Sequence, residues 1–191
     1  MRSRLRPICT HRASCQCRSC RRTRHSIRVQ MAPHLARRAT HHGIPRTNQG
    51  GTTAGPNLVC SAELACTPQE IADQLARFSV PGQDPAAPAV NNGTYFVTDP
   101  RTDLPGGWVT TNISPDGLTV TNTTQRAHVF YDGQIVRSAS RADDGSWYVT
   151  THGFGNNVIP GAATVNQSQG PEIFNYMDQQ MKANIEAHHG R

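Results

Sequence analysis

Two histidines and an arginine form the pattern in this chain with the clearest chemical meaning. The Asp-Gly dipeptide at 132–133 is typical of a two-residue hairpin turn, and such a turn places His128 opposite Arg137. A second two-residue turn, at the Asp-Gly of 144–145, places Arg137 opposite His152. Directly opposed residues on neighbouring strands have Cβ atoms about 4.5–5.5 Å apart. The sequence therefore predicts that His128, Arg137 and His152 form one row on one face of three adjacent strands.

Two imidazoles that flank a guanidinium suit RNA cleavage without a metal. One imidazole removes the 2′-hydroxyl proton, the other protonates the leaving 5′-oxygen, and the guanidinium stabilises charge on the phosphate. An unperturbed histidine titrates at about pH 6.5, which permits both roles. Tyr148 and Thr150 are expected on the same face, and we include them among the catalytic candidates. A structural interpretation stays open, in which one histidine is hydrogen-bonded within the fold and the other is a solvated loop residue.

The segment after His152 is the second candidate. Glycines allow a backbone to approach a ligand closely, and asparagine side chains offer both donors and acceptors. We expect a substrate loop here, formed by Gly153, Gly155, Asn156 and Asn157. The alternative is an ordered turn in which asparagine adopts the left-handed conformation.

Two helices and a run of strands must position these residues. Residues 67–70, Thr-Pro-Gln-Glu, offer a capping hydroxyl, a proline at the first helical position and a glutamate three residues after the cap. Apolar residues follow at helical spacing, namely Ile71, Leu75 and Phe78. A second helix is predicted from Gly170-Pro171 to Gly190, with its own apolar stripe of Phe174, Met177, Met181 and Ile185.

Segments between the two helices have the composition and the turns of short strands. They span residues 94–98, 108–113, 118–122, 128–131, 134–139 and 146–152. The order helix, strands, helix predicts an α+β fold, in which an antiparallel β-meander carries the N-terminal and the C-terminal helix on one face. No apolar run approaches the length of a membrane span, so we expect no membrane segment.

The charge of the chain divides near residue 62. Residues 1–62 contain 12 arginines and no acidic residue, while residues 63–191 hold all 13 acidic residues and only 7 of the 19 basic ones. We expect residues 1–56 to be a disordered basic arm that ends in a flexible Gly/Thr-rich linker at 50–56, and residues 57–190 to be the folded domain.

Three origins for the arm stay open. Its arginine-rich, acid-free composition is compatible with an organelle transit peptide, with a nucleic-acid-binding arm, or with translated upstream sequence. Its four cysteines, Cys9, Cys15, Cys17 and Cys20, include one short zinc-type pair, but the second pair of a structural zinc site is missing. Cys60 and Cys66 close a short loop, and a disulfide between them is left open as well.

Three segments of the chain carry a resemblance to a known family. These are TTQRAHVFYDGQIVR at 123–137, TTHGFGNN at 150–157 and GPEIF at 170–174. They resemble the C-terminal toxin domains of bacterial polymorphic toxins, the variable tips of Rhs-repeat, filamentous-haemagglutinin-like and contact-dependent-inhibition proteins. The resemblance covers about residues 60–187, and Ala127 departs from the glycine that precedes the histidine in such tips.

The resemblance implies an effector attached to a larger delivery protein. Such a domain acts in the cytosol of a target cell and is neutralised by a cognate immunity protein. The family includes nucleases, deaminases, ADP-ribosyltransferases and peptidases, so the resemblance leaves the reaction open.

The missing motifs narrow the choice of reaction. The signatures of a zinc deaminase and of a serine-hydrolase nucleophile elbow are absent. A metal nuclease would cluster acidic residues, but those of this chain lie mostly in turns, as at Asp132, Asp143 and Asp144. We therefore expect an endoribonuclease that acts on RNA with no cofactor and no metal. The competing hypothesis is a non-enzymatic, β-rich secreted or partner-binding module.

Overall fold

The computed structural model describes residues 49–156 and 160–190 of the chain. All the described residues belong to one compact unit of the chain. Residues 1–48 of the predicted disordered arm, which include the cysteines at positions 9–20, lie outside the described residues, as does Asn157.

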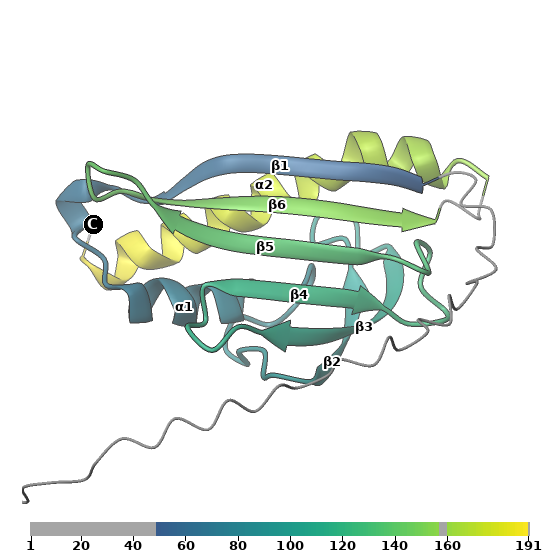
Figure 1. Cartoon of the computed structure of the whole chain (residues 1–191), viewed down its shortest axis with the longest axis horizontal. Helices are drawn as coiled ribbons and strands as arrows, with labels where there is room; N and C mark the ends of the chain where they lie inside the picture. The colour runs from purple at the N-terminus through teal and green to yellow at the C-terminus, as the bar shows by residue number, and fades with distance from the viewer. Residues whose placement is uncertain (1–48, 157–159, 191) are drawn as a thin grey trace, which may run out of the picture. The chain divides into compact units, whose positions relative to one another are not determined.

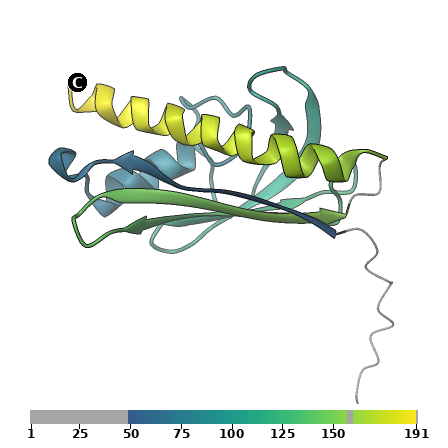
Figure 2. The ribbon, with the colours of Figure 1, turned by 90° about the horizontal axis from the view of Figure 1, so that it is seen from above.

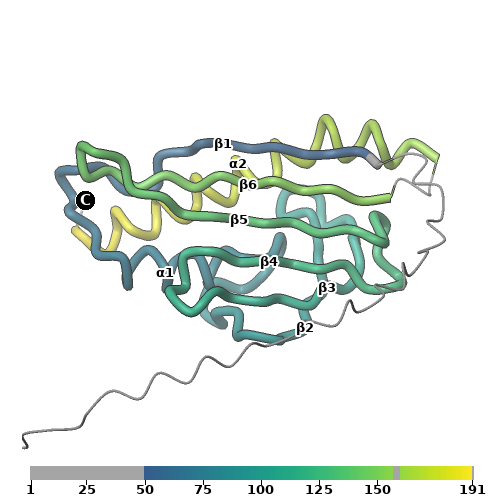
Figure 3. The backbone as a smooth tube through the Cα atoms, in the orientation of Figure 1, coloured from purple at the N-terminus to yellow at the C-terminus, as the bar shows by residue number. Residues whose placement is uncertain are grey.

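A six-stranded antiparallel sheet forms the centre of the described unit (Figure 1). Its spatial order is β1-β6-β5-β4-β3-β2, so the last five strands form a meander and the first strand joins it beside the last (Figure 3). The strands are β1 (Gln49–Cys60), β2 (Gly93–Thr98), β3 (Pro105–Ile113), β4 (Thr119–Thr124), β5 (Gln134–Arg141) and β6 (Trp147–Asn156).

Both long helices cover the same face of this sheet (Figure 2). They are α1 (Pro68–Arg77) and α2 (Ala162–His188), and a short 3-10 helix, η1 (Ala62–Leu64), precedes α1. The predicted α+β fold with an N-terminal and a C-terminal helix is confirmed. Within the described residues, neither helix is long and apolar enough to cross a membrane.

The helix α1 begins where its capping signature predicts. The hydroxyl of Thr67 accepts a hydrogen bond from the backbone N–H of Glu70 at 3.2 Å, and Pro68 occupies the first turn. Ile71 and Leu75 are fully buried on its inner face. Local chemistry is thus sufficient to fix the start of this helix and the side that it buries.

The helix α2 begins eight residues before the predicted start at Gly170. It starts at Ala162, after Gly161 with φ 85°, and continues through Pro171. A proline inside a helix removes one backbone hydrogen bond, which is why the sequence favours a boundary there. Packing against β1 compensates: Asn166 donates to the carbonyl of Gly50 at 3.1 Å, and Gly170 lies against Thr52.

The main core lies between α1, the C-terminal half of α2 and one end of the sheet. Its members are apolar side chains from each of these elements, including Val59, Ile71, Leu75, Val120, Val149, Met181 and Ile185. A disulfide between Cys60 and Cys66 joins the end of β1 to the start of α1. The disulfide between Cys60 and Cys66, which the sequence left open, is therefore present.

The predicted linker at 50–56 is instead most of the edge strand β1. Thr52 and Ala54 are buried on the helix side, whereas Thr53 between them is exposed, which is the alternation of a strand. The folded sheet thus begins at Gln49, before the predicted domain boundary at 57. Glycine and proline hid this strand, because both are uncommon in strand interiors.

The predicted strand at 128–131 is also wrong. Residues 125–133 form the connection between β4 and β5, which pair directly with each other. The Thr124 hydroxyl closes this loop, because it donates to the carbonyl of Gly133 at 3.0 Å and accepts from the N–H of Gly133 at 2.7 Å. The aromatic and β-branched composition of 128–131 therefore serves loop packing rather than sheet pairing.

Candidate functional site

The predicted row of His128, Arg137 and His152 is not formed. Arg137 pairs with Thr151, and the residue opposite it on β4 is Val120. The β5–β6 turn is one residue longer than predicted, because the N–H of Ala142 donates to the carbonyl of Ser146 at 2.8 Å. A shift of one residue moves a side chain to the other face of a sheet. Arg137 and His152 consequently lie on opposite faces, and His128 lies in a loop.

His152 lies on the face of the sheet away from the helices. Tyr148 and Thr150 share this face, as predicted for residues at alternate positions of one strand. His152 is exposed, and its Nδ1 lies 3.5 Å from the hydroxyl of Thr53 on β1. The catalytic roles of these three residues stay predictions, and neither of the other two row members joins them on this face.

Arg137 is completely buried, and its charge is paired with a carboxylate inside the protein. Its Nη2 donates to Oδ1 of Asp178 on α2 at 2.6 Å, and both side chains are at most 1% exposed. Its Nη1 lies 3.4 Å from the hydroxyl of Thr151, and its Cζ lies 5.5 Å from the centre of the Phe174 ring. Burial lowers the pKa of Arg137, and Asp178 opposes that shift. A guanidinium held in this way cannot reach a phosphate in solvent.

Sequence reasoning missed Asp178, although a signal was present. Asp178 follows Met177 on the apolar stripe of α2, one helical turn after Phe174. A carboxylate on a buried stripe requires a partner, since an unpaired buried charge is very unfavourable. Its second oxygen accepts from the side-chain amide of Asn57 at 2.8 Å. The search for that partner leads to Arg137 and removes it from the predicted catalytic row.

The predicted substrate loop is not a loop where the structure describes it. Gly153, Gly155 and Asn156 belong to β6. A Cβ on Gly153 would lie 2.8 Å from Cγ2 of Thr52, and one on Gly155 would lie 2.9 Å from Cβ of Phe130. These glycines therefore allow close packing of neighbouring segments against β6. They shape the interior, and they present no free backbone to a substrate in solution.

A cavity of about 310 Å³ lies on the helix side of the sheet, beyond the main core. The N-terminal half of α2, the inner faces of β2 to β5 and the 125–133 loop enclose it. Most of its wall is apolar, with Val97, Val109, Phe130, Ile135, Ile173 and Phe174 as principal members. The structure thus holds a lined interior space that the sequence did not predict.

The cavity exists because only one helix covers this end of the sheet. The helix α1 ends at Arg77 and packs within the main core, so it does not fill the space over β2 and β3. The inward positions nearest the cavity carry Val97 and Val109, whereas the side chain of Tyr95, on the same face of β2, reaches toward Gly93 and Val90. Valine side chains at these positions leave room between the sheet and α2.

Two polar side chains in the wall have their hydrogen bonds satisfied internally. Asn122 accepts from Thr111 at 2.6 Å and donates to the carbonyl of Ser79 at 2.8 Å. The hydroxyl of Thr124 donates to the carbonyl of Gly133 and accepts from the N–H of the same residue. Neither side chain needs a ligand to meet its hydrogen-bonding capacity.

His128 also lines the cavity, and one of its ring nitrogens has no hydrogen-bond partner among the described residues. Its Nδ1 accepts from the backbone N–H of Phe130 at 3.1 Å, which fixes the proton of the neutral ring on Nε2. Burial lowers the pKa of His128 to about 4, so the ring is neutral near pH 7. A neutral ring in this tautomer has one donor, Nε2–H, and His128 is one of the residues that line the cavity.

The mouth of the cavity is apolar and is flanked by an ion-pair cluster. Leu104 and Val165 line the cavity, yet they are 64% and 47% exposed. Arg101 lies 3.1 Å from Asp99 and 2.7 Å from Glu172 on α2, and thereby ties the β2–β3 connection to that helix. Its hydrogen bonds with Asp99 lower the pKa of that carboxyl. The cluster fixes one side of the opening.

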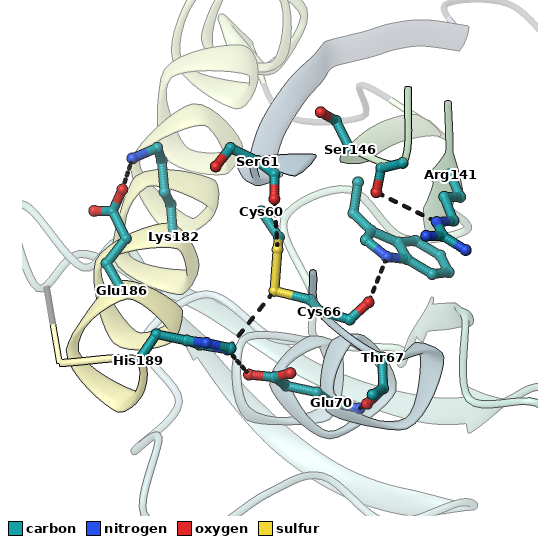
Figure 4. The surroundings of a disulfide bond; sticks show 12 residues. Cys60, Ser61, Cys66, Thr67, Glu70, Arg141, Ser146, Lys182, Glu186 and His189 are labelled. Atoms are coloured by element: carbon teal, nitrogen blue, oxygen red, sulfur yellow. Dashed lines mark hydrogen bonds and ion pairs between the residues drawn. A yellow bond between two sulfur atoms is a disulfide. The ribbon is translucent and has the colours of Figure 1, made fainter. Parts of the chain in front are cut away.

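A second group of reactive side chain types surrounds the disulfide (Figure 4). Nε2 of His189 lies 2.6 Å from the carboxylate of Glu70 and 4.0 Å from Sγ of Cys66. These three residues have the types and spacing of metal ligands, but the sulfur is bonded to Cys60 and is not a thiolate donor. We interpret the group as a structural contact that holds the end of α2 against the start of α1.

Comparisons with known proteins give little guidance. No family model matches the chain, and no curated protein matches it. Among solved structures, the crystal structure of Ara h 8.0201 is similar at a TM-score of 0.39 and 8% identity. The match covers 73% of this chain and 97% of that one. Likeness at this level carries no argument about function.

Proposed function

We propose that this domain binds a small apolar molecule in the cavity between α2 and the sheet. The observation that carries the proposal is the cavity itself, with its apolar wall and its exposed apolar mouth. A volume of about 310 Å³ is at the lower end of the range of small-molecule sites. Apolar walls with few polar groups are typical of such sites.

The opening of the cavity argues for a binding site rather than a closed packing defect. Leu104 and Val165 line the cavity and are 64% and 47% exposed, so a molecule in solution can reach the space. Apolar surface that faces water is unfavourable by about 25 cal/mol per Å². An apolar occupant would remove part of the wall from water.

The disulfide supports a binding module outside a reducing compartment. Structural disulfides persist in oxidising surroundings and are rare in a reducing cytosol. The Cys60–Cys66 bond and the cavity together favour the secreted binding module over a cytosolic enzyme.

The toxin-type ribonuclease stays an untested prediction. Its immunity protein, its delivery protein and its RNA substrate are untested as well. The structural basis for that prediction is lost, because Arg137 is buried with Asp178, and His128 lies in a loop whereas His152 lies on β6. We therefore do not advance it as the function of the domain.

Binding of Nile red, an uncharged dye whose fluorescence rises in apolar surroundings, tests the proposal. The wild-type chain should bind the dye in a saturable, one-to-one manner. Val165→Trp should block the mouth and weaken binding by about tenfold or more, since the new side chain fills the entrance. The matched control is Val90→Trp, because Val90 is 63% exposed and does not line the cavity. Equal binding by both variants, or no saturable binding by the wild type, would refute the proposal.

A further inference from the structure

We propose that the cavity selects uncharged molecules that carry a hydrogen-bond acceptor, such as a ketone or ester carbonyl, and that His128 donates to this acceptor through Nε2–H. The inference rests on the proposed function and specifies the chemical class of its ligand. It follows from the charges and the free polar side-chain groups around the cavity.

No cation is free to receive an anionic ligand. Among the described residues that line the cavity there is no lysine and no arginine, and the only carboxylate is Asp99. The nearby Arg101 is shared between Asp99 and Glu172. Arg137 lies beyond Phe174 and is paired with Asp178. A carboxylate brought into this space would lose its hydration without gaining a counter-charge.

The overall charge acts in the same direction. Residues 49–190 contain 13 acidic and 6 basic residues, so the described unit is net negative. A negative field lowers the local concentration of anionic ligands and slows their association. Both the wall and the surrounding field therefore favour neutral molecules over fatty acids and other carboxylates.

The selection for an acceptor comes from the geometry of His128. Its Nδ1 is already occupied by the N–H of Phe130, so the ring cannot turn to present an acceptor without breaking that bond. Its ring also lies 5.9 Å from the ring of Phe130, which further supports its orientation. Nε2–H has no partner among the described residues, and a ligand oxygen in the cavity would satisfy it.

Three probes of nearly equal size separate the possibilities. They are 2-acetylnaphthalene, which has an uncharged acceptor, 2-ethylnaphthalene, which has none, and 2-naphthoate, which is anionic at pH 8. Each is titrated against Nile red bound to the wild-type full-length chain. We expect 2-acetylnaphthalene to displace the dye at a concentration at least tenfold lower than 2-naphthoate, because the anion finds no cation in the wall.

Variants of the two histidines test the role of the donor. His128→Phe should weaken 2-acetylnaphthalene by about 2- to 10-fold, the range of one neutral hydrogen bond, and leave 2-ethylnaphthalene unchanged. His128→Asn keeps an N–H donor and should retain part of the preference. The matched control His152→Phe, on the other face of the sheet, should bind all three probes as the wild type does.

The outcomes distinguish the two proposals. Absence of Nile red binding by the wild type would overturn the proposed function, and the inference with it. Dye binding with equal displacement by 2-naphthoate and 2-acetylnaphthalene would overturn the inference alone. The inference also fails if His128→Phe binds the dye normally but weakens both neutral probes equally, since that result indicates lost packing and not a lost hydrogen bond.

Discussion

The buried pair of Arg137 and Asp178 provides a stringent test of the structure. The pair joins β5 to α2 at 2.6 Å with no access to solvent. For charge centres about 4 Å apart and an effective dielectric constant of about 20, their attraction is roughly 4 kcal/mol. Replacing Asp178 by Asn removes that attraction but leaves the guanidinium buried. Loss of one partner of a buried ion pair typically destabilises a protein by about 3–5 kcal/mol.

The double variant separates the pair from its components. Arg137→Met with Asp178→Leu replaces both charges by apolar side chains of similar volume, and such replacements are often neutral or stabilising. We expect Asp178→Asn to lower the free energy of unfolding by about 3–5 kcal/mol and the double variant to recover most of that loss. Chemical denaturation with urea, followed by tryptophan fluorescence, measures both changes. The Nε of Arg137 has no hydrogen-bond partner, so its removal eliminates an unsatisfied group as well.

One result would refute this reasoning. If Asp178→Asn changes the free energy of unfolding by less than about 1 kcal/mol, the value typical of an exposed pair, then Arg137 is not buried as described. That outcome would free the guanidinium and revive the ribonuclease prediction. Glu172→Gln provides the control, because Glu172 is 64% exposed in its contact with Arg101 and should contribute little.

Two further predictions concern acid and reducing agents. Burial lowers the pKa of His128 from 6.5 to about 4, so the unfolded state takes up a proton that the folded state refuses between these values. The free energy of unfolding should therefore be unaffected by this group above pH 6.5 and fall by about 1–3 kcal/mol as the pH drops to 4. Urea midpoints measured across this pH range should lack this decrease in the His128→Asn variant. The control variant His152→Asn should keep it. The Cys60–Cys66 disulfide closes a loop with a sequence separation of 6, so its reduction should lower the free energy of unfolding by about 2 kcal/mol according to the loop-entropy relation. A melting temperature that does not change when a dithiol reductant is added would contradict this prediction.

Local signals in the sequence predicted the parts of the fold that local chemistry decides. The capping group of Thr67 and the spacing of Ile71 and Leu75 predict where α1 begins and which side it buries. The alternation along β6 agrees with its environment, since Trp147 and Val149 lie in the core. In these elements the preference of each segment agrees with its final environment, so a single sequence suffices.

The register of Arg137 was decided by one turn. The Asp-Asp-Gly sequence before Ser146 fits turns of more than one length, and the sequence does not distinguish them. The structure selects the longer turn, in which the carboxylate of Asp144 accepts from the N–H of Ser146 at 2.8 Å and Ala142 closes the strand pair. The buried partner Asp178 favours this choice, because only the longer turn directs Arg137 to the helix side.

The cavity could not be predicted from a sequence alone. Its wall combines residues from five strands, several loops and a helix, and its volume depends on the absence of a second helix over β2 and β3. His128 was identified as chemically meaningful, but its predicted partner across a strand was wrong. Its actual partner is a backbone N–H two residues away, and only the loop conformation brings the two together.

The position of β1 determines when the sheet can be completed. β1 contains the first described residues, yet it pairs with β6, so that Gln49 lies opposite Asn156. Contacts between residues so far apart in sequence carry a large loop-closure entropy and form late in folding. During synthesis β1 must remain unpaired until β6 has also left the ribosome, with both of its edges open to other strands. An unpaired strand of this kind is a recognised origin of aggregation and of exchange between copies, which makes early shielding of β1 a requirement for productive folding.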